Sequence, residues 1–189
     1  MSRPPGVALA HERAAELGFP LSCEDVAGAL LATLAAMVPP GGRVLELGTG
    51  AGVGLAWIVS GLGDRTDVEV ASVDLDAELL ERVRRVGWPA YVQLHQGDGA
   101  RLVATLGSFD LVFADAPGGK LTGLERSIAA LAPGGVLLVD DMDLAQHDDP
   151  ELRRALQGVR DTLVRHPELV CAELAAGSGL IVCARREPA

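Results

Sequence analysis

Cysteine and long apolar runs are both scarce in this chain. Three cysteines among 189 residues are too few for the disulfide framework of a secreted domain. Two of them, Cys171 and Cys183, lie in late apolar runs, so we expect both to be buried, inert thiols. No apolar run approaches the ~20 residues of a membrane span, and no apolar signal segment is found near the first residues. These absences predict a cytoplasmic protein with no membrane partner.

Positive charge and aromatic side chains are scarce as well. The formal net charge is −10, and aromatic residues make up 3% of the chain. Proteins that bind nucleic acid use clustered Lys and Arg against phosphates, so we expect no nucleic-acid partner. Lys120 is the single lysine among 16 basic residues, which makes its position informative.

What the chain does have is a run of alternate glycines. A short apolar run of the kind that a buried parallel strand needs is formed by Val44, Leu45 and Leu47, and a helix-like stretch begins near residue 55. Between them lie Gly48, Gly50, Gly52 and Gly54. A strand that enters a helix through glycines places bare backbone and unpaired N–H groups beside a ligand.

The spacing of these glycines indicates which ligand. A dinucleotide-binding fingerprint requires glycine at its first, third and sixth positions. The sixth position is Val53 when counted from Gly48 and Leu55 when counted from Gly50, so both counts fail. With Glu46 two places earlier, the pattern Glu-x-Gly-x-Gly-x-Gly resembles motif I of the class I S-adenosylmethionine-dependent methyltransferases. This resemblance implies S-adenosylmethionine as the cofactor.

Strands and helices alternate along the chain, which is typical of a parallel sheet covered on both faces. Residues 175–178 are too few for a parallel crossover, so the last two strands form an antiparallel hairpin. The sequence therefore predicts one α/β domain of the Rossmann-like methyltransferase type, with an N-terminal helical cap (1–42) and a core (43–189). Its sheet has seven strands, mostly parallel, with an antiparallel last strand. The expected strands are 43–48, 68–74, 90–95, 109–114, 136–140, 168–174 and 179–185, and the expected helices are 7–17, 22–37, 53–62, 77–86, 99–106, 121–131 and 150–165.

Acidic residues follow two of the expected strands. Ligands of open α/β sheets bind beyond the carboxyl ends of the strands, where Asp74 lies. Its carboxylate can accept hydrogen bonds from both hydroxyls of a ribose, whereas Asp76 is expected to cap the next helix. Asp98 has two interpretations, since it can meet the adenine edge or cap a helix at Gly99.

From Pro20 to Arg185 the chain resembles the small-molecule O-methyltransferase family that includes catechol and caffeoyl-CoA O-methyltransferases. The segments that carry the resemblance are 45–50, 72–76, 109–116, 131–141 and 177–185. The family transfers a methyl group to a hydroxyl of a small molecule, and that substrate class is implied here. The cofactor-binding residues implied are Glu46, Gly48, Thr49, Gly50, Gly52, Gly54, Asp74, Leu75, Gly97, Asp98, Gly99 and Asp115.

The family also binds a divalent cation that orients two adjacent substrate oxygens. The ligands implied here are Asp115, Asp140 and Asp141, whose oxygens suit Mg²⁺ or Ca²⁺. Two departures from the family are visible. Asp141 replaces an asparagine, and Lys120 stands five places after Asp115 where the family has its lysine base three places on. Asp115 and Lys120 are the implied catalytic residues; Lys120 is the general base if it folds back through Gly118 and Gly119, and a surface lysine otherwise.

Several alternatives stay open on the sequence. Asp140 and Asp141 can cap a strand without a metal, and His147 is either a base or an exposed loop residue. An aminopropyltransferase of the spermidine-synthase type shares the glycine loop and an acidic pocket. A non-catalytic cofactor-binding module is the third interpretation, favoured by the displaced lysine. The N-terminal helices are a candidate surface for pairing two copies of the chain.

Overall fold

The computed structural model describes residues 2–187, so Met1 and the end of the predicted core, 188–189, lie outside the described residues. The strands are β1 (Arg43–Leu47), β2 (Glu69–Asp74), β3 (Val92–Gln96), β4 (Phe109–Ala114), β5 (Leu131–Val139), β6 (Leu169–Leu174) and β7 (Leu180–Arg185). The helices are α1 (Pro5–Glu16), α2 (Asp25–Ala36), α3 (Val53–Leu62), α4 (Ala77–Arg84), α5 (Gly99–Leu102), α6 (Pro117–Lys120), α7 (Leu124–Ala129), the 3₁₀ turn η1 (Leu144–Gln146) and α8 (Pro150–Arg165). None of the described helices is long and apolar enough to span a bilayer.

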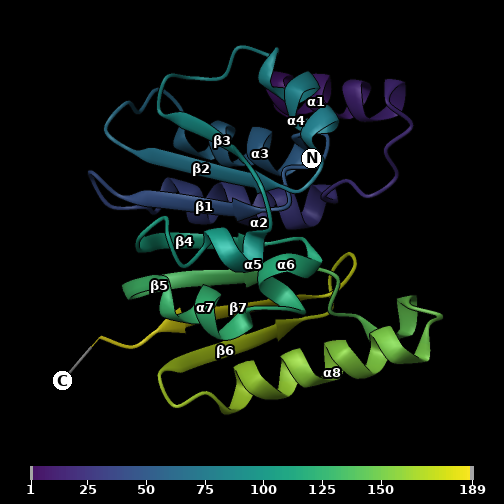
Figure 1. Cartoon of the computed structure of the whole chain (residues 1–189). Coiled ribbons are helices and arrows are strands. Elements are labelled where there is room, and N and C mark those ends of the chain that lie inside the picture. Colours follow the sequence, from purple (N-terminus) through teal and green to yellow (C-terminus); the bar gives the residue numbers. More distant parts are fainter. Residues whose placement is uncertain (1, 188–189) are drawn as a thin grey trace.

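The strands form one sheet in the order β3-β2-β1-β4-β5-β7-β6 (Figure 1). Neighbours from β3 to β5 pair in parallel, and β7 runs antiparallel to both β5 and β6. This confirms the predicted seven-stranded, mostly parallel sheet and the terminal hairpin. The parallel strands therefore end at one common edge, where the candidate site lies.

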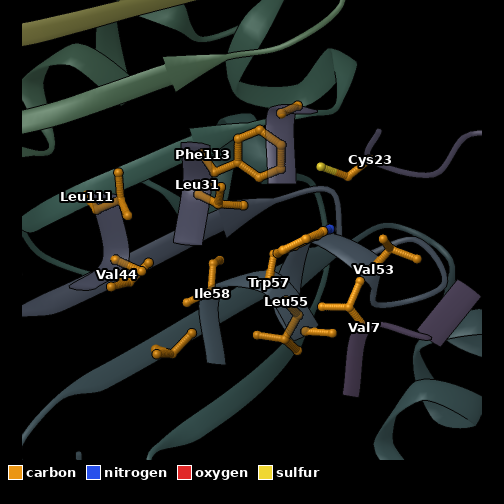
Figure 2. Close-up of a cluster of buried hydrophobic side chains, with 14 of the residues drawn as sticks. Val7, Cys23, Leu31, Val44, Val53, Leu55, Trp57, Ile58, Leu111 and Phe113 are labelled. Atoms are coloured by element: carbon orange, nitrogen blue, oxygen red, sulfur yellow. The ribbon is translucent and has the colours of Figure 1, made fainter. Parts of the chain in front are cut away.

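Successive side chains along the strands point to opposite faces of the sheet and belong to two separate hydrophobic clusters. On β1, Val44 packs with the cluster of α1, α2 and α3, whereas Leu45 packs with the cluster of α7 and α8. Phe113 and Val112 of β4 divide in the same way. Figure 2 shows the first cluster, in which Trp57 and its neighbours on α3 lie beside side chains of the sheet. Both faces are thus covered, as continuous apolar strands require.

The predicted strand 136–140 is too short, because β5 begins at Leu131. We expected Pro133-Gly134-Gly135 to separate a helix from this strand, but the three residues form a bulge inside it, where the register with β4 shifts. Gly134 adopts a φ of 75°. The predicted helix 121–131 is too long, because Gly123 has a left-handed φ of 82° and α7 begins only after it.

The prediction of two free thiols at Cys171 and Cys183 is wrong for this structure, which joins them in a disulfide. The two residues are direct partners in the β6–β7 hairpin, so their side chains project from the same face. Cys23 is the free cysteine among the described residues, and it is buried.

Candidate active site

The alternate glycines form a tight loop between β1 and α3. Gly48, Gly50 and Gly52 have φ values of 107°, 50° and 80°, a region that side chains disfavour. A Cβ at Gly48 would lie 2.6 Å from the carbonyl oxygen of Asp115, so glycine there lets the ends of β1 and β4 approach each other. The loop therefore presents bare backbone at the carboxyl edge of the sheet.

Asp74 at the end of β2 holds this loop. One carboxylate oxygen, Oδ2, accepts from the Gly50 N–H at 2.7 Å, and Oδ1 accepts from the Asp76 N–H at 2.9 Å. Asp76 in turn caps α4 by accepting from Glu78 and Leu79, as predicted. Both Asp74 oxygens keep further lone pairs for a ligand, since a carboxylate accepts about four hydrogen bonds.

A cavity of about 210 Å³, the loop cavity, lies between the glycine loop and Asp74. Its walls include six of the predicted cofactor-binding residues: Gly48, Thr49, Gly50, Gly54, Asp74 and Asp115. A helix N-terminus, bare backbone and a carboxylate face one small volume there. These are the groups that a nucleoside with a charged amino-acid tail needs.

Glu46 lies behind the loop and does not line this cavity. It is fully buried, and its Oε2 accepts from Ser72, whose hydroxyl lies 2.6 Å from that of Thr49. Burial raises the pKa of Glu46 well above its usual range, and the hydrogen bond from Ser72 opposes that shift. Glu46 thus reaches the loop through Ser72 and the Thr49 side chain, and direct contact with a ligand amine stays a prediction.

Four other predicted cofactor residues lie at the ends of β2 and β3, outside the loop cavity. Leu75 is 71% exposed, and the Gly97 N–H donates to the Asp74 carbonyl at 2.8 Å. Asp98 caps α5 by accepting from Ala100, which confirms one of its two interpretations. Gly99 packs closely against Gly118. A ligand role for these residues stays a prediction, as it does for Gly52, which faces Arg13 and Trp88.

A second cavity of about 430 Å³, the lysine cavity, adjoins the first. Its polar lining comes from Glu24, Asp115, Lys120, Asp140, Asp141, His147 and Ser178, among other residues. The two cavities share the wall formed by Leu21, Ser22, Cys23, Asp115, Ala116 and Pro117. Two ligands bound in them would therefore meet at this wall.

Lys120 lies inside the lysine cavity, so the surface-lysine interpretation is wrong. Its side chain is 5% exposed. Nζ donates to the carbonyl oxygen of Asp140 and to Oδ2 of Asp141, both at 2.9 Å. The ammonium is therefore fixed between the two residues that follow β5.

The carboxylates around Lys120 have perturbed protonation. Burial, followed by the negative charges of Asp140 and Asp141, raises the pKa of Asp115 well above its usual range. Burial also raises the pKa of Asp140, whereas hydrogen bonds from Ser178 and from the Asp141 N–H lower it. Asp141 has a φ of 60°, the one positive value among described residues other than glycine. Perturbed carboxyls beside a fixed ammonium are typical of functional sites.

These residues do not fit the divalent cation that the resemblance implies. Mg²⁺ and Ca²⁺ take six or more oxygen ligands. Asp140 Oδ1 already accepts from Ser178 and from the Asp141 N–H, and Lys120 takes Asp141 Oδ2. Across residues 2–187, no group of three or more His, Cys, Asp or Glu side chains is arranged to hold a metal. The predicted ligands Asp115, Asp140 and Asp141 are thus not assembled as a metal site.

Comparison with known proteins places this geometry in a family. A methyltransferase-domain model matches residues 45–142, from the middle of β1 to just beyond β5. A Mycobacterium sp. (strain JLS) protein named "Putative O-methyltransferase" is 30% identical over 95% of this chain and 86% of its own length. A Mycobacterium avium protein of the same name is 31% identical over 95% and 85%. This chain belongs to the O-methyltransferase family.

Solved structures share the fold of this O-methyltransferase. A Corynebacterium glutamicum protein superposes with a TM-score of 0.85 at 22% identity, covering 100% of this chain and 93% of its own. The O-methyltransferase TomG of Streptomyces achromogenes, solved with S-adenosylmethionine, superposes with a TM-score of 0.80 at 20% identity, over 98% and 91% of the two chains. At these identities the likeness concerns the fold.

Three residues of the O-methyltransferase site were missed by the sequence interpretation: Phe19, Cys23 and Ser178. Phe19 and Cys23 precede α2 and line the loop cavity from the N-terminal cap, although neither belongs to a motif. Ser178 lies in the β6–β7 turn and donates to Asp140. One signal was present for Ser178, because the segment Gly177-Ser178-Gly179 is part of the resemblance to the family.

Proposed function

We propose that this chain transfers a methyl group from S-adenosylmethionine to a hydroxyl of a small molecule. The shared wall between the loop cavity and the lysine cavity supports this most strongly. A displacement at carbon requires donor and acceptor to approach in line, and two adjoining cavities supply that proximity. Membership of the O-methyltransferase family disfavours the aminopropyltransferase alternative.

On the donor side, S-adenosylmethionine supplies a methyl group activated by its sulfonium. Asp74 would accept hydrogen bonds from the ribose hydroxyls while it continues to hold Gly50. The backbone of the loop and the start of α3 would receive the carboxylate of the methionine tail. Asp115, which lines both cavities, would lie beside the transferred group.

On the acceptor side, the chain's own cation is Lys120. A general base must carry a lone pair, but Nζ donates two hydrogen bonds, one of them to a carboxylate. We therefore propose that Lys120 orients the acceptor oxygen by hydrogen bonding and does not take its proton.

The proton acceptor that we propose is His147. Its Nε2 lies 3.0 Å from the carbonyl oxygen of Asp141, a contact in which Nε2 carries the hydrogen. The neutral ring then keeps its lone pair on Nδ1. His147 lines the lysine cavity and is the one histidine to do so.

The proposal is tested with purified protein, S-adenosylmethionine and a panel of phenols, catechols and aliphatic alcohols. We expect stoichiometric release of S-adenosylhomocysteine with methylation of one hydroxylated class. Tight cofactor binding without turnover on any hydroxylated acceptor would favour the non-catalytic module. No binding of the cofactor at millimolar concentration would refute the proposal.

Cytoplasmic location and pairing of two copies complete the proposal. Cytosolic thiols are kept reduced, so this location implies that Cys171 and Cys183 are reduced in the cell, whereas the structure joins them. Alkylation of thiols in freshly lysed cells, read by mass spectrometry, distinguishes the two states. Light scattering of the purified chain tests pairing through the N-terminal helices, where Leu9 is 61% exposed.

A further inference from the structure

We infer that the Lys120 ammonium is the resident cation of the lysine cavity. It lies at the position where the resemblance of this chain to the family implies a divalent metal. The acceptor oxygen is bound by this ammonium, and the chain takes no Mg²⁺ or Ca²⁺ there. The part concerning the acceptor rests on the proposed function. The part concerning the metal rests only on the contacts of Lys120.

The conformation of the loop before Lys120 places the Lys120 side chain in the lysine cavity. Gly118 and Gly119 have non-helical backbone angles, with a φ of 100° at Gly119, so the chain doubles back within α6. The Gly119 N–H donates to the Thr122 carbonyl at 2.7 Å, and its carbonyl accepts from Ser127 at 2.8 Å. A Cβ at Gly119 would clash with Leu47 of β1. The two extra residues between Asp115 and Lys120 are thus absorbed in a fixed loop.

The Lys120 ammonium binds two oxygens of the residues that the resemblance implies as metal ligands. It takes the Asp140 carbonyl and Asp141 Oδ2, while Ser178 and the Asp141 N–H occupy Asp140 Oδ1. A divalent ion at this place would have to displace Lys120 from both contacts. It would also leave a positive side chain, 5% exposed, beside a second positive charge.

One hydrogen of Lys120 remains for the acceptor. An ammonium has three N–H donors, and contacts within the described residues account for two of them. A single N–H binds one oxygen, whereas a divalent ion can chelate two. The acceptor therefore needs one hydroxyl and no neighbouring hydroxyl. A phenol suits the site better than an aliphatic alcohol, since its hydroxyl ionises near pH 10, as tyrosine does.

The test measures binding of Mn²⁺ alone to the full-length chain by electron paramagnetic resonance, without any acceptor. We compare wild type, Lys120→Met, which removes the charge at similar volume, and Lys120→Arg, which keeps it. We expect no wild-type binding below ~1 mM and at least a ~10-fold gain in affinity for Lys120→Met, while Lys120→Arg behaves like wild type. Circular dichroism and cofactor calorimetry show whether each variant is folded.

Two results would overturn the inference. One is wild-type binding of Mn²⁺ at micromolar concentration that Asp141→Asn weakens. The other is a folded Lys120→Met variant that gains no affinity for Mn²⁺. If Lys120→Met does not fold, EDTA on the wild type decides: unchanged methylation of a monophenol supports the inference, and its loss overturns it. Failure of the proposed function would appear separately, as failure to bind S-adenosylmethionine in calorimetry.

Discussion

Replacing Asp74 by alanine is the sharpest test of the donor side. The substitution removes the acceptor of two backbone N–H groups, those of Gly50 and Asp76, and the proposed acceptor of the ribose hydroxyls. A hydrogen bond to a charged group contributes about 1.5–3 kcal/mol. Loss of about 2–3 kcal/mol of binding free energy corresponds to a ~30–150-fold rise in the Kd for S-adenosylmethionine.

Calorimetry with S-adenosylmethionine and S-adenosylhomocysteine measures this change. Asp74→Asn is the closer variant, because the amide keeps one oxygen and loses the charge; we expect its Kd between those of wild type and Asp74→Ala. Both cofactor forms should weaken together, since they share the ribose.

A control must separate lost binding from a damaged turn. Asp149 is suited to this, because it accepts from the Glu151 N–H at the start of α8 and lines neither cavity. Asp149→Ala should cost about 1 kcal/mol of stability, as for other N-caps, with cofactor affinity unchanged. If Asp74→Ala also loses stability but keeps wild-type affinity, Asp74 is only structural and our assignment of the ribose site is refuted.

Three further predictions concern stability. Gly54→Ala should destabilise the fold by about 1–3 kcal/mol, because its Cβ would clash with the buried Glu46 carboxyl. Gly158→Ala on α8 meets open space and should stabilise the fold by about 0.5–1 kcal/mol. Urea unfolding measures both changes, and equal effects of the two substitutions would contradict the clash at Gly54. Burial raises the pKa of Glu46, so this residue ionises first in the unfolded chain, and its contribution should lower wild-type stability as the pH rises above about 4.5. Glu46→Gln should therefore raise the Tm more at pH 8 than at pH 4. A gain in Tm that does not depend on pH would contradict the raised pKa as its cause. Reducing the Cys171–Cys183 disulfide should lower the free energy of unfolding of the wild type by about 3 kcal/mol, as expected for a 12-residue separation. The same reductant should leave the Tm of a Cys171→Ser/Cys183→Ser variant unchanged. An equal fall in Tm in both proteins would show that the disulfide is not the cause.

The sheet was predictable because its signals are local and agree with one another. The alternation of strands and helices predicted a parallel sheet, and the short connection at 175–178 predicted a terminal antiparallel hairpin. The strand pairing confirms both. The predicted element boundaries near Gly123 and Gly134 were wrong, because a glycine in the sequence indicates that an unusual φ is allowed but not which local structure adopts it. Gly123 precedes the first residue of a helix, whereas Gly134 belongs to a bulge inside a strand.

The disulfide was missed because the predicted turn is one residue too short. In an antiparallel pair, residues equidistant from the centre of the turn face each other, and a turn over 175–178 places Cys171 opposite Val182. In the structure Leu174 pairs with Leu180, so the turn is centred on Gly177 and Cys171 faces Cys183. By contrast, no local pattern could place Cys23 or Phe19 in the site, because their position depends on how the N-terminal cap packs against the glycine loop.

The lysine shows why a shifted residue need not mean a lost function. Counted along the chain, Lys120 is two places late, and this departure favoured a non-catalytic module. In space, Gly118 and Gly119 absorb the two places, and the ammonium reaches the residues that follow β5. What changed is the charge it meets: Asp141 stands where the family has a neutral asparagine, and its carboxylate pairs with Lys120. Both departures from the family therefore belong to one ion pair, and each accounts for the other.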